Sequence, residues 1–361
     1  MLRRDFTGRL LASALCVPRL RAQEASRIRL REVAAQHGLL VGSAVAYAQL
    51  ERPECARLLA AEASILVSEN DMKWRRIHPE PDQYDFRRAD ALLEFAKAHG
   101  QKLRGHNLCW HEHNPDWLGR VATKQNAADL LRGHIAAVAG HFHGQIHSWD
   151  VVNEAVGVED GREDGLRKSI WLDLIGPDYL AVAFRAAAEA DPAALLTYND
   201  YNLEQDSPEH ERKREAVLGL LRSLRDRQAP IQALGLQSHL KAGANASSWT
   251  GLHRFLEQVE RLGLQVFVTE LDVDDRALPA DIAERDRQVG ELYRDYLSNV
   301  LQHGSVKAVL TWGLSDRDSW LNHAKPRADG LPQRPLPFDG ELQPKPAFVA
   351  MRDAVTRSLR N

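Results

Sequence analysis

The feature that most constrains the fold is an alternation of short apolar runs with longer segments of helical periodicity, from residue 38 to residue 355. Eight runs rich in Val, Ile and Leu are candidate strands, at residues 39–45, 64–68, 102–105, 146–152, 194–198, 231–236, 264–269 and 306–312. Helical spacing marks residues 89–96, 128–138, 180–190, 211–224, 249–262 and 282–301. Eight strand–helix units in series predict an α/β fold in which a parallel sheet closes into a single (β/α)8 TIM barrel.

A doubly wound open sheet is the structural alternative. Such a sheet normally carries a glycine-rich phosphate turn after an early strand, and the sequence has none. No linker rich in Pro or Ser divides the chain of 361 residues, so we expect one catalytic barrel over residues 25–361.

The first 24 residues form a separate segment. Arg3 and Arg4 precede an apolar stretch over residues 10–17, which resembles a twin-arginine export signal, although Arg9 and Arg19 interrupt the pattern. The pattern in residues 1–24 therefore favours an export signal, which implies a periplasmic or secreted protein. The alternative, a disordered basic tail on a cytoplasmic protein, stays open. No later run reaches ~18 apolar residues, so we expect no membrane partner for the mature form.

Charge and cysteine content exclude other classes of protein. Lys and Arg number 47 against 50 for Asp and Glu, a net charge of -3 that gives no field for binding nucleic acid. The three cysteines, Cys16, Cys55 and Cys109, cannot make a disulfide framework and have no metal-ligand spacing. We expect Cys55 and Cys109 to be buried, and we expect a monomer that uses no cofactor.

Polar and aromatic residues gather just past the predicted strands, on the face where TIM barrels carry their active sites. Glu154 follows the fourth strand and Glu270 ends the seventh, so the two lie across the barrel mouth from each other. Two opposed carboxyl groups suggest glycoside hydrolysis, and in a retaining enzyme the two groups stand about 5 to 5.5 Å apart. The charge on one raises the pKa of the other and keeps it protonated. Taken alone, either glutamate is more simply a helix cap.

The surrounding motifs favour the catalytic reading. The stretch WDVVNEA at residues 149–155 is similar to the acid/base motif of glycoside hydrolase family 10, the endo-β-1,4-xylanases, and VTELDV at 268–273 to its nucleophile motif. Further segments match in the family's order over roughly residues 38 to 350, namely 69–74, 104–111, 198–202, 237–239 and the pair Trp312 and Trp320. The resemblance implies cleavage of xylan or xylo-oligosaccharides through a covalent intermediate.

The resemblance also implies roles for individual residues. Glu154 would be the general acid/base and Glu270 the nucleophile. Three neighbours would support them: Asn153 by donating to the sugar 2-hydroxyl, His239 by bonding both Glu270 and Asp272, and Gln237 by steadying Glu154.

Other matched residues would contact the sugars. Fixed donors and acceptors suit the two sugars on the non-reducing side of the cut, and aromatic rings suit pyranose faces. By the family's pattern Trp320 would crowd the place of the glucose hydroxymethyl group and so favour xylose. The predicted substrate-binding residues are Glu69, Asn70, Lys73, His106, Trp110, Gln237, Trp312 and Trp320. For Trp74, Trp149 and Trp171 we predict core packing instead.

One departure and two rival functions remain. His113 stands where the family usually has a glutamine that helps to bind a distal sugar. Together with His106, His111 and Glu112 it forms a cluster that could belong to a metal-dependent hydrolase. We favour sugar binding for His106 and a structural hydrogen bond for His111, with no metal site. A barrel that binds carbohydrate without cleaving it is the other rival, but it would be expected to lack one of the two carboxylates.

Overall fold

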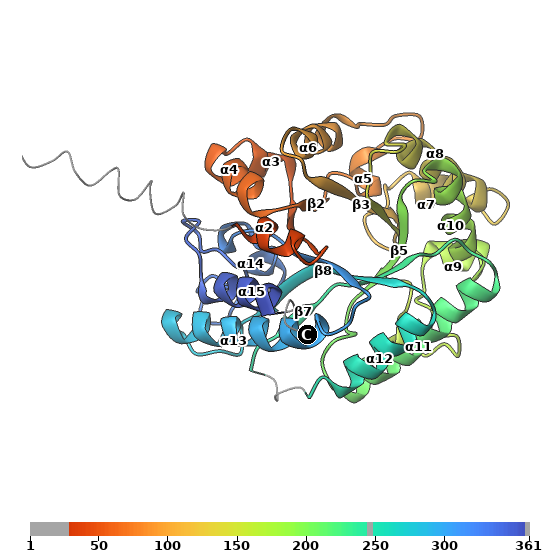
Figure 1. The fold of residues 1–361 in the computed structure, drawn as a ribbon. Coiled ribbons are helices and arrows are strands. Elements are labelled where there is room, and N and C mark those ends of the chain that lie inside the picture. The colour runs from red at the N-terminus through yellow and green to blue at the C-terminus, as the bar shows by residue number, and fades with distance from the viewer. Residues whose placement is uncertain (1–28, 244–247, 358–361) are drawn as a thin grey trace, which may run out of the picture.

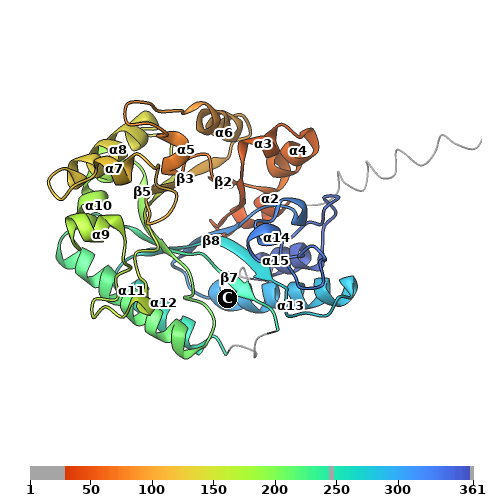
Figure 2. The ribbon, with the colours of Figure 1, turned by 180° about the vertical axis from the view of Figure 1, so that it is seen from behind.

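Eight parallel strands form a closed barrel with helices around its outside (Figures 1 and 2). The computed structural model describes residues 29–243 and 248–357, so the predicted export segment lies outside the described residues. The sheet runs in chain order, β1 also pairs with β9, and pairing of β6 with β8 completes the ring, which confirms the predicted TIM barrel. The barrel strands are β1 Leu40–Val45, β2 Ile65–Ser68, β3 Lys102–Cys109, β4 Ser148–Asn153, β5 Leu195–Asp200, β6 Ala233–Leu236, β8 Gln265–Asp274 and β9 Val306–Thr311.

The six predicted helices are present, with ends that move by a few residues. They are α6 Arg87–Ala98, α8 Ala127–His141, α10 Tyr179–Ala190, α11 Pro208–Asp226, α12 Thr250–Arg261 and α13 Ile282–Val300. Further helices begin, end or interrupt the units: α2 Leu30–Ala35, α3 Tyr47–Leu50, α4 Pro53–Glu62, α5 Trp74–Ile77, α7 Leu118–Val121, α9 Ile170–Ile175, η1 Val158–Asp160, η2 Asp316–Asp318, α14 Leu321–Ala324 and α15 Pro346–Arg357. None of these helices combines the length and apolar composition needed to cross a membrane.

Local sequence signals set where the long helices begin. Helix α11 starts at Pro208, whose missing N–H costs nothing in the first turn, and the Ser207 hydroxyl accepts a hydrogen bond from the His210 N–H at 3.1 Å. The Asp281 carboxylate caps α13 in the same way, at 2.8 Å from the Glu284 N–H. A capped first turn fixes where each of these helices begins, and so where the loop between the preceding strand and the helix ends.

Four strands extend beyond the predicted ends, β4 and β5 by one or two residues and β3 and β8 by four or five, and a ninth strand is added. The runs predicted over 102–105 and 264–269 continue to Cys109 and Asp274, so Glu270 lies within a strand rather than at its end. The short strand β7, His239–Lys241, pairs with the far end of β8, His239 opposite Asp272. Residues at the rim have polar side chains but continue the strand backbone, so a search for apolar runs alone could not detect them.

The barrel interior contains one layer of apolar side chains and, next to it, a pair of charged side chains. The apolar cluster consists of Ala44, Ile65, Val67, Ala233, Phe267, Ala308, Leu310 and Trp312. The guanidinium of Arg104, with no exposed surface, lies 5.0 Å from the Phe267 ring and pairs with Asp150. Trp74, Trp149 and Trp171 are buried in the separate layer between strands and helices, and Cys55 and Cys109 are buried too, as predicted.

Candidate active site

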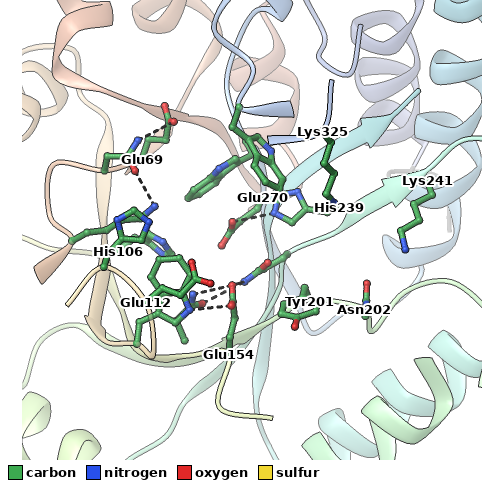
Figure 3. Close-up of a pocket in the computed structure, with 18 residues that line it drawn as sticks. Glu69, His106, Glu112, Glu154, Tyr201, Asn202, His239, Lys241, Glu270 and Lys325 are labelled. Atoms are coloured by element: carbon green, nitrogen blue, oxygen red, sulfur yellow. Dashed lines mark hydrogen bonds and ion pairs between the residues drawn. The ribbon is translucent and has the colours of Figure 1, made fainter. Parts of the chain in front are cut away.

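A cavity of about 520 Å³ opens at the carboxyl ends of the strands (Figure 3). Every predicted site residue except Asp272 lines it: Glu69, Asn70, Lys73, His106, Trp110, Asn153, Glu154, Gln237, His239, Glu270, Trp312 and Trp320. Asp272 is buried and bonded to His239. Six further residues complete the lining: Glu112, His113, Tyr201, Asn202, Lys241 and Lys325.

Glu154 follows directly after β4 and is held on both carboxyl oxygens. Its backbone has φ of 56°, a left-handed conformation that is rare for a non-glycine residue and typical of functional sites, and its N–H donates to the Asn199 carbonyl at 2.8 Å. Oε1 accepts hydrogen bonds from Gln237 at 2.8 Å and Asn153 at 3.2 Å, and Oε2 accepts one from the Trp110 indole at 2.9 Å. The contact predicted between Gln237 and Glu154 is therefore present.

The surroundings of Glu154 favour its protonated form. Burial raises the pKa of this carboxyl, the negative charges of Asp200 and Glu270 raise it further, and the hydrogen bonds from Gln237 and Trp110 oppose the shift. A carboxyl with a raised pKa can deliver a proton at neutral pH.

Glu270 lies within β8 and has different neighbours. Oε1 accepts a hydrogen bond from Asn199 at 2.7 Å, and Oε2 lies 3.3 Å from His239 Nε2. The other nitrogen of that ring, Nδ1, lies 2.8 Å from Asp272 Oδ1, and the Trp320 indole donates to Asp272 Oδ2 at 2.7 Å. His239 therefore bridges the two carboxylates, as the motif resemblance implies.

A cation keeps Glu270 ionised. Burial works to raise the pKa of Glu270, but the hydrogen bond and the positive charge of His239, together with the electrostatic effect of nearby His106, lower it below its ordinary value. Burial would lower the pKa of His239, yet Asp272 and Glu270 raise it to about 10, so this ring is positively charged at neutral pH. The cavity thus contains one carboxyl with a raised pKa, Glu154, and one with a lowered pKa, Glu270.

A chain of side-chain amides joins the two glutamates. Gln237 donates to Asn153 Oδ1 at 3.4 Å, and Asn199 Nδ2 donates to the same oxygen at 2.9 Å as well as to Glu270. The Thr269 hydroxyl donates to Asn199 Oδ1 at 2.7 Å and so fixes which end of that amide faces Glu270. Both carboxyl groups are therefore positioned by one connected set of hydrogen bonds.

Asn199 is a site residue that the sequence analysis did not single out. It belongs to the polar run at residues 198–202, which was recognised only as a matching segment. The signal that could have identified it is its place at the carboxyl end of β5. Asp200 beside it was also missed, and its carboxylate contributes to the raised pKa of Glu154.

A second polar group lines the other end of the cavity. Asn70 donates to Glu69 at 3.0 Å, and Lys73 Nζ donates to Asn70 Oδ1 at 2.9 Å. The same ammonium group lies 5.2 Å from the Trp110 ring centre and 5.8 Å from that of Trp312. Burial lowers the pKa of Lys73 and raises that of Glu69. Donors, acceptors and aromatic faces thus meet in one small volume, as sugar recognition requires.

The histidines of the rival metal site have other contacts. His106 Nδ1 lies 3.0 Å from Asp150 Oδ2, and the His113 ring stacks on Trp110 with centres 5.1 Å apart. The hydrogen bond predicted for the His111 ring is not found among the described residues, because Nδ1 lies 4.0 Å from Glu154 Oε2 and Nε2 lies 3.6 Å from Glu112 Oε1. In the described ranges, no three His, Cys, Asp or Glu side chains are grouped so that they could hold a metal ion.

Comparison with known proteins identifies the family. The model of glycosyl hydrolase family 10 matches residues 29–354. The chain belongs to this family. An endo-1,4-beta-xylanase B of Paenibacillus barcinonensis is 37% identical over 327 residues, which cover 85% of this chain and 93% of the relative. An endo-1,4-beta-xylanase B of Thermotoga neapolitana is 34% identical and covers 96% of both chains.

Solved structures of family 10 agree with the architecture. Xylanase 10B of Thermotoga petrophila, solved in complex with xylobiose, has a TM-score of 0.84 and 32% identity and covers 93% of this chain and 99% of its own. Native xylanase 10B of Thermotoga maritima has a TM-score of 0.83 and 33% identity, with 92% and 99% covered. The family 10 barrel therefore accounts for nearly all of the described residues.

Proposed function

We propose that the chain is a retaining endo-1,4-β-xylanase that cleaves β-1,4-xylosidic bonds in xylan or xylo-oligosaccharides. The observation that carries the proposal is a pair of carboxyl groups, the partly exposed Glu154 and the buried Glu270, that line one cavity and have pKa values shifted in opposite directions. Environments that separate two carboxyl pKa values in this way assign one group as acid and the other as nucleophile. Two curated relatives that are 37% and 34% identical over most of the chain carry the name endo-1,4-beta-xylanase B.

The reaction would proceed in two displacements. Glu270 attacks the anomeric carbon and forms an ester, while Glu154 gives its proton to the departing glycosidic oxygen. The ester removes the negative charge of Glu270, which lowers the pKa of Glu154. Glu154, now a carboxylate, takes a proton from the attacking water, the ester bond breaks, and Glu270 leaves as a carboxylate. In this scheme Asn153 donates to the 2-hydroxyl of the sugar being transferred.

The remaining lining residues would hold the sugars around that centre. Glu69, Asn70, Lys73 and His106 would bind the two sugars on the non-reducing side of the cut. Trp110, Trp312 and Trp320 would cover pyranose faces, and Trp320 would also discriminate xylose from glucose. His239 and Asp272 act on Glu270 rather than on the substrate, so we assign them as positioning residues.

Product analysis tests this function. Purified protein is incubated with xylan, xylohexaose and cellohexaose; we expect short xylo-oligosaccharides from the first two and far slower cleavage of the third. NMR should show the β-anomer of the product first, because two inversions retain configuration. An initial α-product would contradict the retaining mechanism, and no turnover of any xylan substrate would favour the rival carbohydrate-binding barrel. Activity that is lost in EDTA and restored by zinc would favour the metal-dependent rival.

We further propose that the protein acts outside the cytoplasm as a monomer. The paired Arg3 and Arg4 ahead of an apolar stretch support export. Fractionation of cells producing the wild-type chain and an Arg3→Lys/Arg4→Lys variant tests the localisation, and we expect the variant to stay in the cytoplasm. Size-exclusion chromatography with light scattering should give the mass of one chain, 40.5 kDa, less any segment removed on export.

A further inference from the structure

We propose that Arg167 positions the acid/base Glu154, by holding the backbone turn from which the Glu154 carboxyl group projects. The cavity lining includes Glu154 but not Arg167, so Arg167 acts on the reaction through Glu154 and not on the substrate. The inference rests on the proposed xylanase function, because it takes Glu154 as the group that gives its proton to the departing oxygen.

The backbone at Glu154 has an unusual conformation that its surroundings must hold. Its φ of 56° lies in the left-handed region, where a residue with a side chain is strained and persists only if its neighbours fix it. The Glu154 N–H donates to the Asn199 carbonyl at 2.8 Å, and the Glu154 carbonyl accepts a hydrogen bond from Arg167 Nε at 3.0 Å. The peptide groups on both sides of the strained residue are therefore fixed, and Arg167 fixes one of them.

Arg167 donates to three consecutive backbone carbonyl groups. Besides Nε on Glu154, its backbone N–H donates to Ala155 at 2.7 Å and its Nη2 donates to Val156 at 3.2 Å. A guanidinium group can span two carbonyls because its N–H donors lie in one rigid plane and point in several directions. A single residue thus fixes the path of the chain over residues 154–156.

The loop after β4 doubles back on itself, which places Arg167 next to the end of that strand. Val156 pairs with Leu166 in an antiparallel bridge, and the Gly157 N–H donates to the Gly165 carbonyl at 2.9 Å. A Cβ on Gly157 would lie 3.0 Å from the Cβ and 3.1 Å from the Cα of Arg167, so glycine allows this close approach. The loop is built so that Arg167 meets the carbonyl groups that follow β4.

The rest of the guanidinium group also contacts protein. Nη2 donates to the Tyr201 hydroxyl, and Nη1 lies 2.9 Å from Glu159 Oε1. Only 13% of the Arg167 side chain is exposed, so these groups and the carbonyls, rather than solvent, satisfy most of its donors. Arg167 is therefore itself held in place, as a residue that positions another must be.

Fixing the turn fixes where the acid delivers its proton. Hydrogen bonds to both carboxyl oxygens hold the far end of the Glu154 side chain, and Arg167 holds the near end through the backbone. Proton transfer requires the carboxyl group to lie within hydrogen-bond reach of the glycosidic oxygen, and a small misplacement is costly. Loss of the Arg167 contacts should therefore weaken proton delivery and leave the attack by Glu270 intact.

The test uses two substrates that differ in their need for the proton. Xylohexaose has a sugar leaving group that must be protonated, whereas an aryl xylobioside with an acidic phenol releases a phenolate. Arg167→Lys keeps the charge but cannot span two carbonyls. We expect it to lower kcat on xylohexaose about 10- to 100-fold with a smaller change in KM, and kcat/KM on the aryl xylobioside less than about 3-fold.

A double variant shows whether Arg167 acts through Glu154. Once the carboxyl group is removed, there is nothing left for Arg167 to position. Arg167→Lys added to Glu154→Ala should therefore change the rate on xylohexaose less than about 2-fold. A further loss as large as that of Arg167→Lys in the wild-type background would overturn the proposal.

Two matched controls separate positioning from folding. Arg162→Lys makes the same change in the same loop, at a residue that pairs with Asp164, and Glu159→Gln removes an anionic partner of Arg167 but keeps its carbonyl contacts. Ion pairs that are partly exposed contribute little, so both controls should stay within about 2-fold of wild type on both substrates. Thermal unfolding of every variant is followed by circular dichroism, and rates are compared well below the lowest midpoint.

The outcomes distinguish this inference from the function beneath it. If the wild type cleaves neither substrate, the proposed xylanase function fails. If it cleaves both and Arg167→Lys keeps the wild-type rates, or loses as much on the aryl xylobioside as on xylohexaose, the positioning role is overturned and the xylanase function stands. Arg167→Gln is the second variant, for which we expect the same difference between substrates, and it decides the question if Arg167→Lys does not fold.

Discussion

Two glutamates that line one cavity differ in chemistry because their immediate neighbours differ. Glu270 faces the cation His239, whereas Glu154 faces amide and indole donors and lies near the carboxylate of Asp200. Burial pushes both pKa values upwards, so the sign of the net shift is decided by whether a positive charge lies within reach. Replacing a neighbour of one glutamate should therefore move the pKa of that glutamate more than the pKa of the other.

His239→Asn should shift the acid limb of the pH profile. The variant removes the cation beside Glu270 and leaves Asp272 uncompensated, so the pKa of Glu270 rises and more of it is protonated at mildly acidic pH. The acid limb of kcat/KM against pH, measured from pH 3 to 8, should move to higher pH. His113→Gln alters a histidine of the same cavity that does not contact Glu270 and serves as control. An acid limb at the wild-type position in the His239 variant would contradict the positioning role.

Glu154→Ala should harm substrates according to their leaving groups. Hydrolysis of xylan needs a proton on the departing oxygen, so we expect its rate to fall about 10²- to 10⁴-fold. The phenolate of an aryl xylobioside with an acidic phenol leaves without being protonated. The rate of the first step on this substrate should therefore fall much less, and a covalent intermediate should accumulate. Glu270→Ala is the matched comparison, because loss of the nucleophile should abolish turnover of both substrates. Equal losses on both substrates in Glu154→Ala would reject the acid role.

At the level of strands, one glycine makes room for the hydrogen bonds that hold Glu270, the proposed nucleophile. A Cβ on Gly235 of β6 would lie 2.1 Å from Asn199 Oδ1 and 3.1 Å from the Thr269 methyl group. The bare backbone at this point therefore allows Asn199 of β5 to reach across the barrel interior to Glu270 of β8. The geometry of the site thus depends on a strand residue that contributes no side chain.

Gly235→Ala should impair catalysis through Asn199. The added methyl group forces the amide away from Glu270 and from Asn153, and misplacement of a reacting group by about 1 Å can cost about 100-fold. We expect kcat to fall by about 10- to 100-fold with a smaller change in KM. Gly133→Ala on α8, where a new Cβ meets nothing within 4 Å, should keep wild-type kcat and be slightly more stable. Wild-type kcat in Gly235→Ala would show that Asn199 does not position the nucleophile.

The strands also show what sequence reasoning could and could not supply. Apolar runs located all eight barrel strands, because a strand buried on both faces must be apolar along its length. They missed the ends of β3 and β8 and the whole of β7, where polar side chains face the cavity while the backbone stays paired. Motif resemblance singled out Glu154 and Glu270 as catalytic candidates, but the contribution of Asn199 depends on contacts between β5, β6 and β8 that no single segment contains.

The barrel also holds some partly buried histidines in the neutral form, and this links its stability to pH. His147 precedes β4 at the end of the barrel away from the cavity, with Nδ1 3.1 Å from the Ser148 hydroxyl. Burial lowers its pKa, and the nearby charges of Lys102 and Arg104 lower it further, to about 3. In the unfolded chain the same ring titrates near pH 6.5. Unfolding in mild acid therefore binds a proton that the folded protein excludes.

The sign of this effect gives a prediction for the free energy of unfolding. Because the folded pKa is depressed, the contribution of His147 is fully present above about pH 6.5 and is lost as the pH falls towards 3, at about 1.4 kcal/mol per pH unit. Other groups in the folded protein titrate over the same pH range, so the measured quantity is the difference in the free energy of unfolding between wild type and a variant that lacks His147. Denaturant unfolding of wild type and His147→Gln at pH 7, 6, 5 and 4 should show the wild type losing stability relative to the variant below pH 6.5.

A second substitution separates titration from lost contacts. His147→Phe also cannot bind a proton but changes packing near Phe267, 5.9 Å away between ring centres. The free energy of unfolding of His147→Phe at pH 7 should differ from that of His147→Gln. The difference in this free energy between wild type and His147→Phe should still change with pH as steeply as the difference between wild type and His147→Gln. A difference that stays constant from pH 7 to 4 in both variants would mean that the folded barrel accepts a proton on His147 as readily as the unfolded chain.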